Sequence, residues 1–303
     1  MLRKVVQIMA TFITNAYWLF PFGSFGIYTG KLKSVCVPGL NCWSCPAAVG
    51  GCPIGAIQNF MVSIRLTLGS GQYQFGLYVL GFLGMLGTLT GRMVCGWLCP
   101  FGFFQDLMHK LPTHKFGIWN PLTYIKYMIL ILFVFLLPLL VVDDFGFGTT
   151  WFCKYICPAG TLEAGIPLIF LRPDLRGLIG GLFLNKMTIL ILLLIWMAFT
   201  SRPFCRTMCP LGAIYSLFNS VSVFRMHWNA AKCTHCGNCE DICPMGVKFY
   251  ESSNHRECIR CLKCYQTCHF DAISFEIKGL EQPKLVINKK DVMDRFIHHN
   301  SRL

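Results

Sequence analysis

The sequence predicts an α-helical membrane protein with a small cysteine-rich α+β domain near its C-terminal end. Hydrophobic residues make up 54% of the 303 residues and charged residues only 14%, whereas soluble proteins are about 25% charged. The 18 cysteines fall mostly in short, evenly spaced groups, several followed by proline. This composition excludes a disordered chain, argues against a wholly soluble protein, and is too apolar for a small secreted disulfide scaffold.

Four apolar segments approach the length of about 20 residues that a helix needs to cross the hydrocarbon core. They cover residues 5–20, 73–90, 122–142 and 183–200. The first has a basic start like a signal peptide, but no small-residue cleavage site follows it and Tyr17-Trp18 suits an interfacial belt, which predicts an uncleaved anchor. Two shorter stretches, 55–68 and 159–171, are predicted to be re-entrant or interfacial helices.

Cysteine motifs recur along this apolar part and indicate an internal duplication. The recurring pairs are Cys95-x-x-x-Cys99-Pro100 with Cys205-x-x-x-Cys209-Pro210, and Cys45-Pro46 with Cys157-Pro158. Each C-x-x-x-C-P motif follows a predicted span, and each of the other two motifs lies upstream of a short apolar stretch. We therefore expect a membrane domain over residues 1–224, built from two tandem repeats of about 1–115 and 116–224.

Residues 225–277 differ in character, because the apolar runs stop while cysteines and charges increase. The pattern C-x2-C-x2-C-x3-C occurs twice, as Cys233, Cys236, Cys239 and Cys243, and as Cys258, Cys261, Cys264 and Cys268. This spacing is similar to that of bacterial two-cluster ferredoxins, in which the fourth cysteine of each motif binds the other [4Fe–4S] cluster. It predicts one cluster on Cys233, Cys236, Cys239 and Cys268, and another on Cys258, Cys261, Cys264 and Cys243. Zinc is the alternative, but zinc motifs use cysteine pairs. Residues 278–303 are expected to form a polar, basic tail.

The membrane cysteines predict one or two further iron–sulfur clusters, because two pairs brought together by the repeat supply four thiolates. The expected inner site consists of Cys95, Cys99, Cys205 and Cys209, and the expected outer site of Cys42, Cys45, Cys153 and Cys157. Cys52 and Cys36 remain as spare or substitute ligands. Disulfides or buried reduced thiols are the alternatives.

Two segments and the ferredoxin motifs carry a resemblance to a known family. The segments are Cys95-Gly-Trp-Leu-Cys99-Pro100-Phe101-Gly102 and Cys205-Arg-Thr-Met-Cys209-Pro210-Leu211-Gly212. The chain resembles the membrane-bound polyferredoxin family of NapH/NosR/CcoG-type quinol dehydrogenase-like proteins over roughly residues 70–275. The resemblance implies four or more spans, cytoplasmic [4Fe–4S] clusters and electron exchange with the quinone pool. The motifs around Cys42 and Cys153 exceed the simplest pattern of that family and suggest redox centres on both membrane faces.

The net charge and the lack of a haem-attachment motif limit the kinds of partner and cofactor that we expect. The net charge of +13 is spread along the chain and mostly flanks apolar runs, which indicates a membrane surface and no nucleic acid. Iron–sulfur clusters are assembled in the cytoplasm, and thiolates stay reduced there. We therefore expect a multi-pass protein of the inner (cytoplasmic) membrane, with both termini and the ferredoxin domain inside and other electron-transfer subunits as partners. No haem-attachment motif is present, and all eight histidines lie outside the four predicted spans.

Asp106 and His109 are the candidate quinone-binding residues, because they lie three residues apart just after Cys99 and suit a proton relay. A solvated helix face at the headgroup level is the alternative. Three functions compete at this point. The chain is a quinol dehydrogenase subunit, a trans-membrane electron conduit without quinone chemistry, or a redox-sensing or metal-maturation accessory protein.

Overall fold

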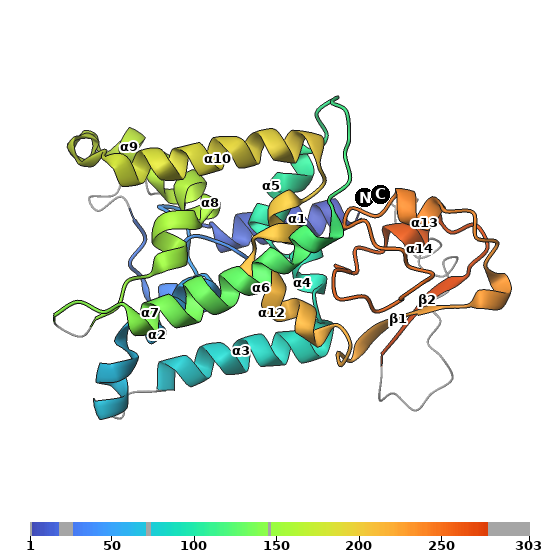
Figure 1. Ribbon diagram of the computed structural model, residues 1–303, viewed down its shortest axis with the longest axis horizontal. Coiled ribbons are helices and arrows are strands. Elements are labelled where there is room, and N and C mark those ends of the chain that lie inside the picture. Colours follow the sequence, from blue (N-terminus) through green and yellow to red (C-terminus); the bar gives the residue numbers. More distant parts are fainter. Residues whose placement is uncertain (1, 18–26, 71–73, 145–146, 278–303) are drawn as a thin grey trace, which may run out of the picture.

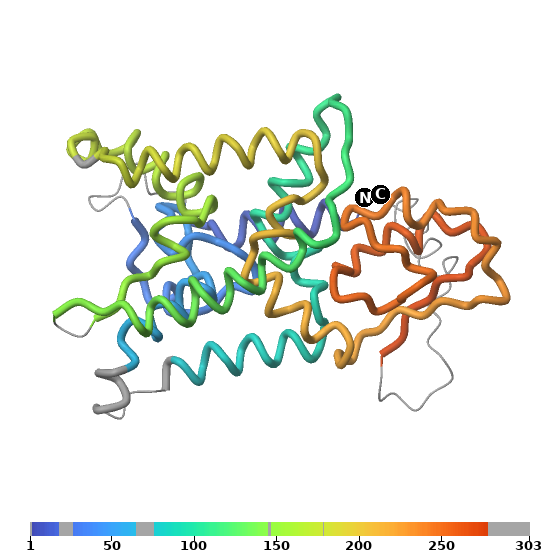
Figure 2. Tube along the Cα trace, in the orientation of Figure 1, coloured from blue at the N-terminus to red at the C-terminus, as the bar shows by residue number. Residues whose placement is uncertain are grey.

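The computed structural model describes residues 2–17, 27–70, 74–144 and 147–277 (Figure 1). In these residues the fold is mostly helical, with one two-stranded sheet. The helices fill one end of the molecule and the cysteine-rich domain fills the other (Figures 1 and 2). The predicted basic tail lies outside the described residues, as do residues 18–20 of the first predicted span and residue 73 of the second.

The helical end combines long helices along the long axis of the molecule with short helices that begin after cysteines (Figure 1). A π-helical segment, Leu130–Leu136, joins α6 to α7 and makes one continuous rod. The helices are α1 Leu2–Thr14, α2 Pro53–Ser70, α3 Gln74–Thr90, α4 Met93–Trp97, α5 Pro100–Met108, α6 Ile125–Ile129, α7 Leu137–Leu140, α8 Pro158–Gly160, α9 Ile166–Leu171, α10 Gly181–Phe199, α11 Pro203–Thr207 and α12 Pro210–Phe218.

Two helical stretches of the described chain, Asn120–Leu140 and Gly181–Phe199, are long and apolar enough to cross a membrane. They overlap the third and fourth predicted spans. Shorter apolar helices at Pro53–Ile64, Gly76–Thr90 and Pro158–Leu171 coincide with the second predicted span and the two short stretches.

The first predicted span is shorter than expected, since α1 ends at Thr14. The Thr14 hydroxyl and the Asn15 amide both donate back to carbonyls of the last turn. Beyond them the Thr14 carbonyl accepts from the Val49 N–H at 3.0 Å, and the Tyr17 N–H donates to the Ala47 carbonyl at 3.1 Å. The chain therefore leaves the helix to pair with the cysteine-bearing loop.

The outer faces of the long helices are apolar. Large apolar side chains are exposed at Leu77, Leu80, Met85 and Leu89 of α3 and at Leu184, Ile191, Leu192 and Ile195 of α10. Soluble monomers rarely expose contiguous apolar surface of this kind. Together with the two long apolar helices, this surface indicates a membrane protein.

The cysteine-rich domain is closed by an antiparallel pair of strands, β1 Phe224–Trp228 and β2 Ile273–Ile277, with Met226 opposite Phe275. Two short helices, α13 Asn238–Asp241 and α14 Lys263–Thr267, lie between the strands. Met226, Phe249 and Ile273 form a small core, against which several cysteines pack. The strands therefore join the two ends of the cysteine-rich segment.

A buried ion-pair network joins this domain to the helical end. The carboxylate of Glu257 accepts from Arg92 Nη1 at 2.6 Å and from Lys126 Nζ. Arg92 follows α3 and Lys126 lies in α6, so one carboxylate holds two helices. Arg260, which is also buried, donates to the Asn219 carbonyl at 2.8 Å. The domain is thus attached through largely buried charged side chains.

Glu257→Gln is expected to lower the free energy of unfolding by about 3–5 kcal/mol, because it leaves two buried cations without their carboxylate. Thermal unfolding in detergent, followed by circular dichroism, measures the change. The matched control is Glu251→Gln, because the Glu251 pair with Lys248 is exposed and should leave the unfolding temperature nearly unchanged. Equal shifts in the two variants would show that the Glu257 network does not hold the domains together.

Candidate metal centres

The first ferredoxin loop and the last ferredoxin cysteine surround one cavity. Its lining includes Cys233, Cys236, Cys239 and Cys268, together with aromatic and aliphatic side chains. We call these four residues the first ferredoxin set. The structure therefore brings together the four cysteines that the crossed motif pattern groups.

A neighbouring cavity is lined by Cys243, Cys258, Cys261 and Cys264, the second ferredoxin set. Burial, followed by the charges of Cys261 and Cys243, raises the pKa of the Cys258 thiol to about 12. Cys239 of the first set also lines this second cavity. The two sets are therefore adjacent.

The two loops share an unusual backbone. In each loop the residues on either side of the second cysteine have positive φ: His235 (52°) and Gly237 (78°) in the first loop, Arg260 (48°) and Leu262 (60°) in the second. Such angles cost free energy in residues other than glycine and persist where the surroundings impose them. Here they curl the chain so that successive thiols face one cavity.

A third group of cysteines lies close together, with one member in each of α4 and α11 and one at the start of each of α5 and α12. We call these residues the proximal set: Cys95, Cys205, Cys99 and Cys209. Burial raises the pKa of the Cys95 thiol to about 11, and the charge of Cys205 contributes. Cys99 and Cys209 are the N-cap residues of the two helices, and each accepts a hydrogen bond from the glycine three residues on, at 3.4 Å. The Gln105 amide adds a hydrogen bond to Cys205 Sγ at 2.9 Å.

Two buried arginines make reciprocal contacts across the proximal set. Arg92 Nη2 donates to the Cys205 carbonyl at 2.5 Å, and Arg202 Nη1 donates to the Cys95 carbonyl at 2.7 Å. Both arginines are fully buried, and each stands three residues before the first cysteine of its motif. Sequence analysis did not assign them this role, although the shared spacing Arg-x-x-Cys was a usable signal.

A third cavity, of about 430 Å³, is lined by Cys42, Cys52, Cys153 and Cys157. We call these residues the distal set, because Cys52 and Cys157, at the starts of α2 and α8, lie away from the cysteine-rich domain (Figure 1). This arrangement differs from the expected pairing, since Cys52 takes the place of Cys45. The Cys45 thiol donates to Asn15 Oδ1 at 3.7 Å and does not line the cavity.

Cys36 also lies outside the distal cavity, although it is near enough to Cys52 for the two thiols to interact electrostatically.

A sequence signal distinguishes Cys52 from Cys45. Cys52, Cys99, Cys157 and Cys209 all stand in Cys-Pro-x-Gly, whereas Cys45 is followed by Pro-Ala-Ala. In each of the four motifs, the backbone N–H of the glycine donates a hydrogen bond to the cysteine sulfur.

The donor sets suit four-iron clusters better than single ions. In the described part of the chain, no three His, Cys, Asp or Glu side chains converge closely enough to hold one metal ion. The thiols of the two ferredoxin sets and of the distal set instead surround cavities, as the corner thiolates of a [4Fe–4S] cube must. The proximal set adds backbone N–H donors and two buried guanidinium groups that would offset the negative charge of a thiolate cluster. Arg92 Nε finds no hydrogen-bond partner among the described residues.

All 18 cysteines lie in the described residues, and each is a free thiol. The proximal set is close to the second ferredoxin set, because the Gly96 backbone packs on the Ile259 carbonyl with no room for a side chain. The proximal and distal sets also adjoin, since the Leu40 N–H donates to Cys99 Sγ at 3.3 Å and Leu40 lines the distal cavity. The four sets therefore follow one another along the molecule.

Asp106 and His109 line a cavity of about 380 Å³ that Cys261 also borders. Asp106 binds Arg202 through two hydrogen bonds, of 2.7 and 2.6 Å, and Arg3 through one of 2.5 Å. Burial opposes its ionisation, but the charges of Arg202 and Arg3 lower the pKa of Asp106 to about 2. Asp106 therefore stays ionised at neutral pH and acts as a counter-ion. The pKa of His109 is lowered, mainly by burial.

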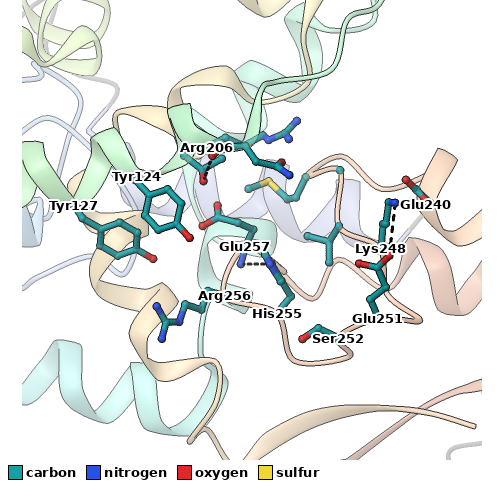
Figure 3. A pocket seen from close by; sticks show the side chains of 15 residues that line it. Tyr124, Tyr127, Arg206, Glu240, Lys248, Glu251, Ser252, His255, Arg256 and Glu257 are labelled. Atoms are coloured by element: carbon teal, nitrogen blue, oxygen red, sulfur yellow. Dashed lines mark hydrogen bonds and ion pairs between the residues drawn. The ribbon is translucent and has the colours of Figure 1, made fainter.

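Another cavity, of about 480 Å³, lies between the cysteine-rich domain and α6 (Figure 3). Tyr127 lines it from α6 and Tyr124 from the 3₁₀ turn just before α6. Glu257 and His255 line it from the domain. Arg206 is 7% exposed, follows Cys205 in the chain and is influenced by the charge of Cys243. It therefore places a positive charge between the second ferredoxin set and the proximal set.

Comparison with known proteins gives matches along most of the chain. A family profile described as "4Fe-4S binding domain" matches residues 75–118, 125–170 and 185–229, each of which holds one C-x-x-x-C-P motif. A second profile with the same description matches residues 225–247. No solved structure matches significantly.

Several known proteins are similar to this chain in sequence. The chain is 34% identical over 234 residues to the uncharacterized protein MJ0750 of Methanocaldococcus jannaschii, covering 74% of this chain and 85% of the relative. It is 25% identical to the putative electron transport protein YccM of Escherichia coli, covering 72% and 60%. It is 24% identical to the ferredoxin-type protein NapH of E. coli, covering 63% and 64%. With its cysteine sets, these matches show that the chain belongs to the polyferredoxin-type family of 4Fe–4S ferredoxin-type electron-transport proteins.

Proposed function

We propose that this iron–sulfur electron-transfer protein is a multi-pass protein of the cytoplasmic membrane. It passes electrons between a cytoplasmic ferredoxin domain, residues 225–277, and an acceptor on the other side. The observation that carries this proposal is the order of the four cysteine sets along the molecule. The second ferredoxin set packs against the proximal set through Gly96 and Ile259, and the proximal set adjoins the distal set through Leu40.

Each cysteine set is proposed to hold one [4Fe–4S] cluster, which when bound accepts and releases one electron at a time. The chain supplies the conditions for this. Arg92 and Arg202 place positive charge beside the proximal thiolates, and the N–H groups of Gly102 and Gly212 donate to two of the sulfurs. Positive charge and N–H donors both favour the more negative, reduced state of a thiolate site.

The proposed topology follows from the position of the start of α1 beside the ferredoxin domain. Arg3 and Lys4 line a cavity with Lys263, so the start of α1 lies on the ferredoxin side. Three crossings by α3, α6–α7 and α10, with α1 and the chain that follows it as the fourth, would return the chain to that side and leave both termini in the cytoplasm. We propose membrane residues 1–224 as two repeats of about 1–115 and 116–224, because Arg92 and Arg202 make equivalent contacts across them.

Quinone is a second candidate for the electron acceptor or donor. The supporting observation is the cavity of about 380 Å³ that brings His109 and Asp106 beside Cys261 of the second ferredoxin set. Because Arg202 and Arg3 hold Asp106, His109 is the side chain there that we propose contacts a quinone. Relatives named as ferredoxin-type or electron transport proteins support other electron-transfer subunits as partners.

Iron content tests the four proposed sites. We expect about sixteen irons per purified chain, about twelve after Cys52→Ser, and an unchanged number after Cys45→Ser, because only Cys52 faces the distal cavity. Iron and acid-labile sulfide assays on anaerobically purified protein measure this. About eight irons in the unaltered chain would confine clusters to the ferredoxin domain, and equal losses in the two variants would contradict the proposed distal ligands.

Reconstituted vesicles test electron passage across the membrane. Quinone-free vesicles with trapped ferricyanide receive dithionite outside, and bleaching of the ferricyanide reports transfer. We expect transfer with the unaltered protein and loss of transfer in the double variant Cys153→Ala with Cys157→Ala, because these thiols border the distal cavity. The double variant should keep its ferredoxin irons. Transfer only after menaquinone is added would favour the quinone candidate, and equal rates with both proteins would contradict the conduit.

A further inference from the structure

The segment from Gly39 to Cys42 occupies the space between the proximal and distal sets. Gly39, Leu40 and Asn41 are all buried, with Leu40 2% and Asn41 0% exposed. The segment enters the helical end from the long loop between α1 and α2. It therefore passes through the interior without regular secondary structure, where unpaired backbone polar groups are costly.

One end of the segment lies against the proximal set. The Leu40 N–H donates to Cys99 Sγ at 3.3 Å. A Cβ on Gly39 would stand 2.7 Å from the Cα of Cys99, a distance that real side chains do not tolerate. The absence of a side chain at residue 39 is therefore what lets the segment approach Cys99 closely enough for this hydrogen bond.

The other end of the segment belongs to the distal set. Leu40, Asn41 and Cys42 all line the distal cavity. The Asn41 N–H donates a hydrogen bond to the Cys52 sulfur. The Cys42 N–H donates to Glu163 Oε2 at 2.6 Å, which fixes the position of this residue. Cys42 is thus joined to Cys99 by two residues of covalent chain and one hydrogen bond.

We infer that the Gly39–Cys42 segment is the electronic bridge between the proximal and distal sets. This inference rests on the proposed function and names the route that it uses. In the step, the proximal site loses one electron and the distal site gains it, with no bond or proton transferred. A low-potential one-electron reductant at the ferredoxin domain and a one-electron oxidant beyond the distal set complete the balance. Bonded and hydrogen-bonded atoms couple two sites more strongly than a gap of the same width.

Tyr215 is the other group that reaches both sets. It is fully buried, and its hydroxyl is near enough to feel the charges of Cys95 and Cys99 on one side and of Cys52 on the other. The hydroxyl donates to the Pro38 carbonyl at 3.1 Å. Its ring makes no hydrogen bond to a sulfur among the described residues. Tyr215 therefore holds the start of the segment through Pro38, whereas the Leu40 N–H makes the direct contact with the Cys99 sulfur.

Two variants remove the contact in different ways. Leu40→Pro deletes the N–H that donates to Cys99, and Gly39→Ala introduces a Cβ that must push the segment away from Cys99. Gly84→Ala is the matched control, because nothing lies within 4 Å of a Cβ at that position of α3. The holoprotein is reduced with dithionite, mixed with ferricyanide and freeze-quenched. EPR then follows oxidation of the proximal signal, and iron content is measured in parallel.

We expect both bridge variants to keep the iron content of the control while losing the fast oxidation of the proximal signal and the spin–spin broadening between the two sites. Full iron with unchanged transfer and unchanged broadening in both variants would overturn the bridge and leave the proposed function intact. An unaltered protein without a proximal or distal EPR signal would instead contradict the proposed function itself.

A measurement on the unaltered protein keeps the test independent of how the variants fold. Among the described residues, Leu40 is the only leucine whose N–H donates to a proximal sulfur. Selective ¹⁵N-leucine labelling should therefore produce a ¹⁵N hyperfine coupling in the pulsed EPR spectrum of the reduced proximal site. A spectrum without this coupling would overturn the proposed contact, and ¹⁵N-glycine labelling, which reports Gly102 and Gly212, serves as the positive control.

Discussion

The structure depends on how negative sulfur groups are accommodated away from water. An isolated charge in an apolar interior costs far more than a protein's net stability, so it must be paired and hydrogen-bonded. Around the proximal set this is achieved by two fully buried arginines, each of which crosses to the cysteine motif of the other half. Their positions in turn require carboxylates, and Glu257 and Asp106 supply them.

This chain of charge compensation also determines the architecture. Arg92 pairs with Glu257 of the cysteine-rich domain, so the group that places positive charge beside the proximal set also attaches this domain to the helical end. Arg202 pairs with Asp106 of α5, and Arg3 of α1 binds the same carboxylate. The arrangement around the proximal thiols therefore links α1, the two C-x-x-x-C-P motifs of the proximal set and the cysteine-rich domain. Removing one of these charged side chains would therefore leave partners on several helices without their counter-ion.

Much of the fold and of the site was predictable from the sequence, because the signals were local. The third and fourth apolar runs became long helices, and the spacing of the ferredoxin motifs grouped Cys268 with Cys233 and Cys243 with Cys258 as the structure places them. Long-range choices were less accessible. The loop after α1 decides that Cys52 and not Cys45 faces the distal cavity, and the interpretation of Asp106 as a proton relay ignored the arginines that come from α1 and from the turn before α11.

The distal set contains one further irregularity, in the spacing of its first two cysteines. Residues 43–51 separate Cys42 from Cys52, whereas three residues separate Cys95 from Cys99, Cys153 from Cys157 and Cys205 from Cys209. A three-residue spacer keeps its second thiol at the start of the helix that follows the first, as Cys95 in α4 and Cys99 before α5 show. The longer spacer frees Cys42 from the helix and lets its own strand of chain fold inward. Residues just before this spacer therefore lie in the interior, where Leu40 contacts Cys99 and also lines the distal cavity.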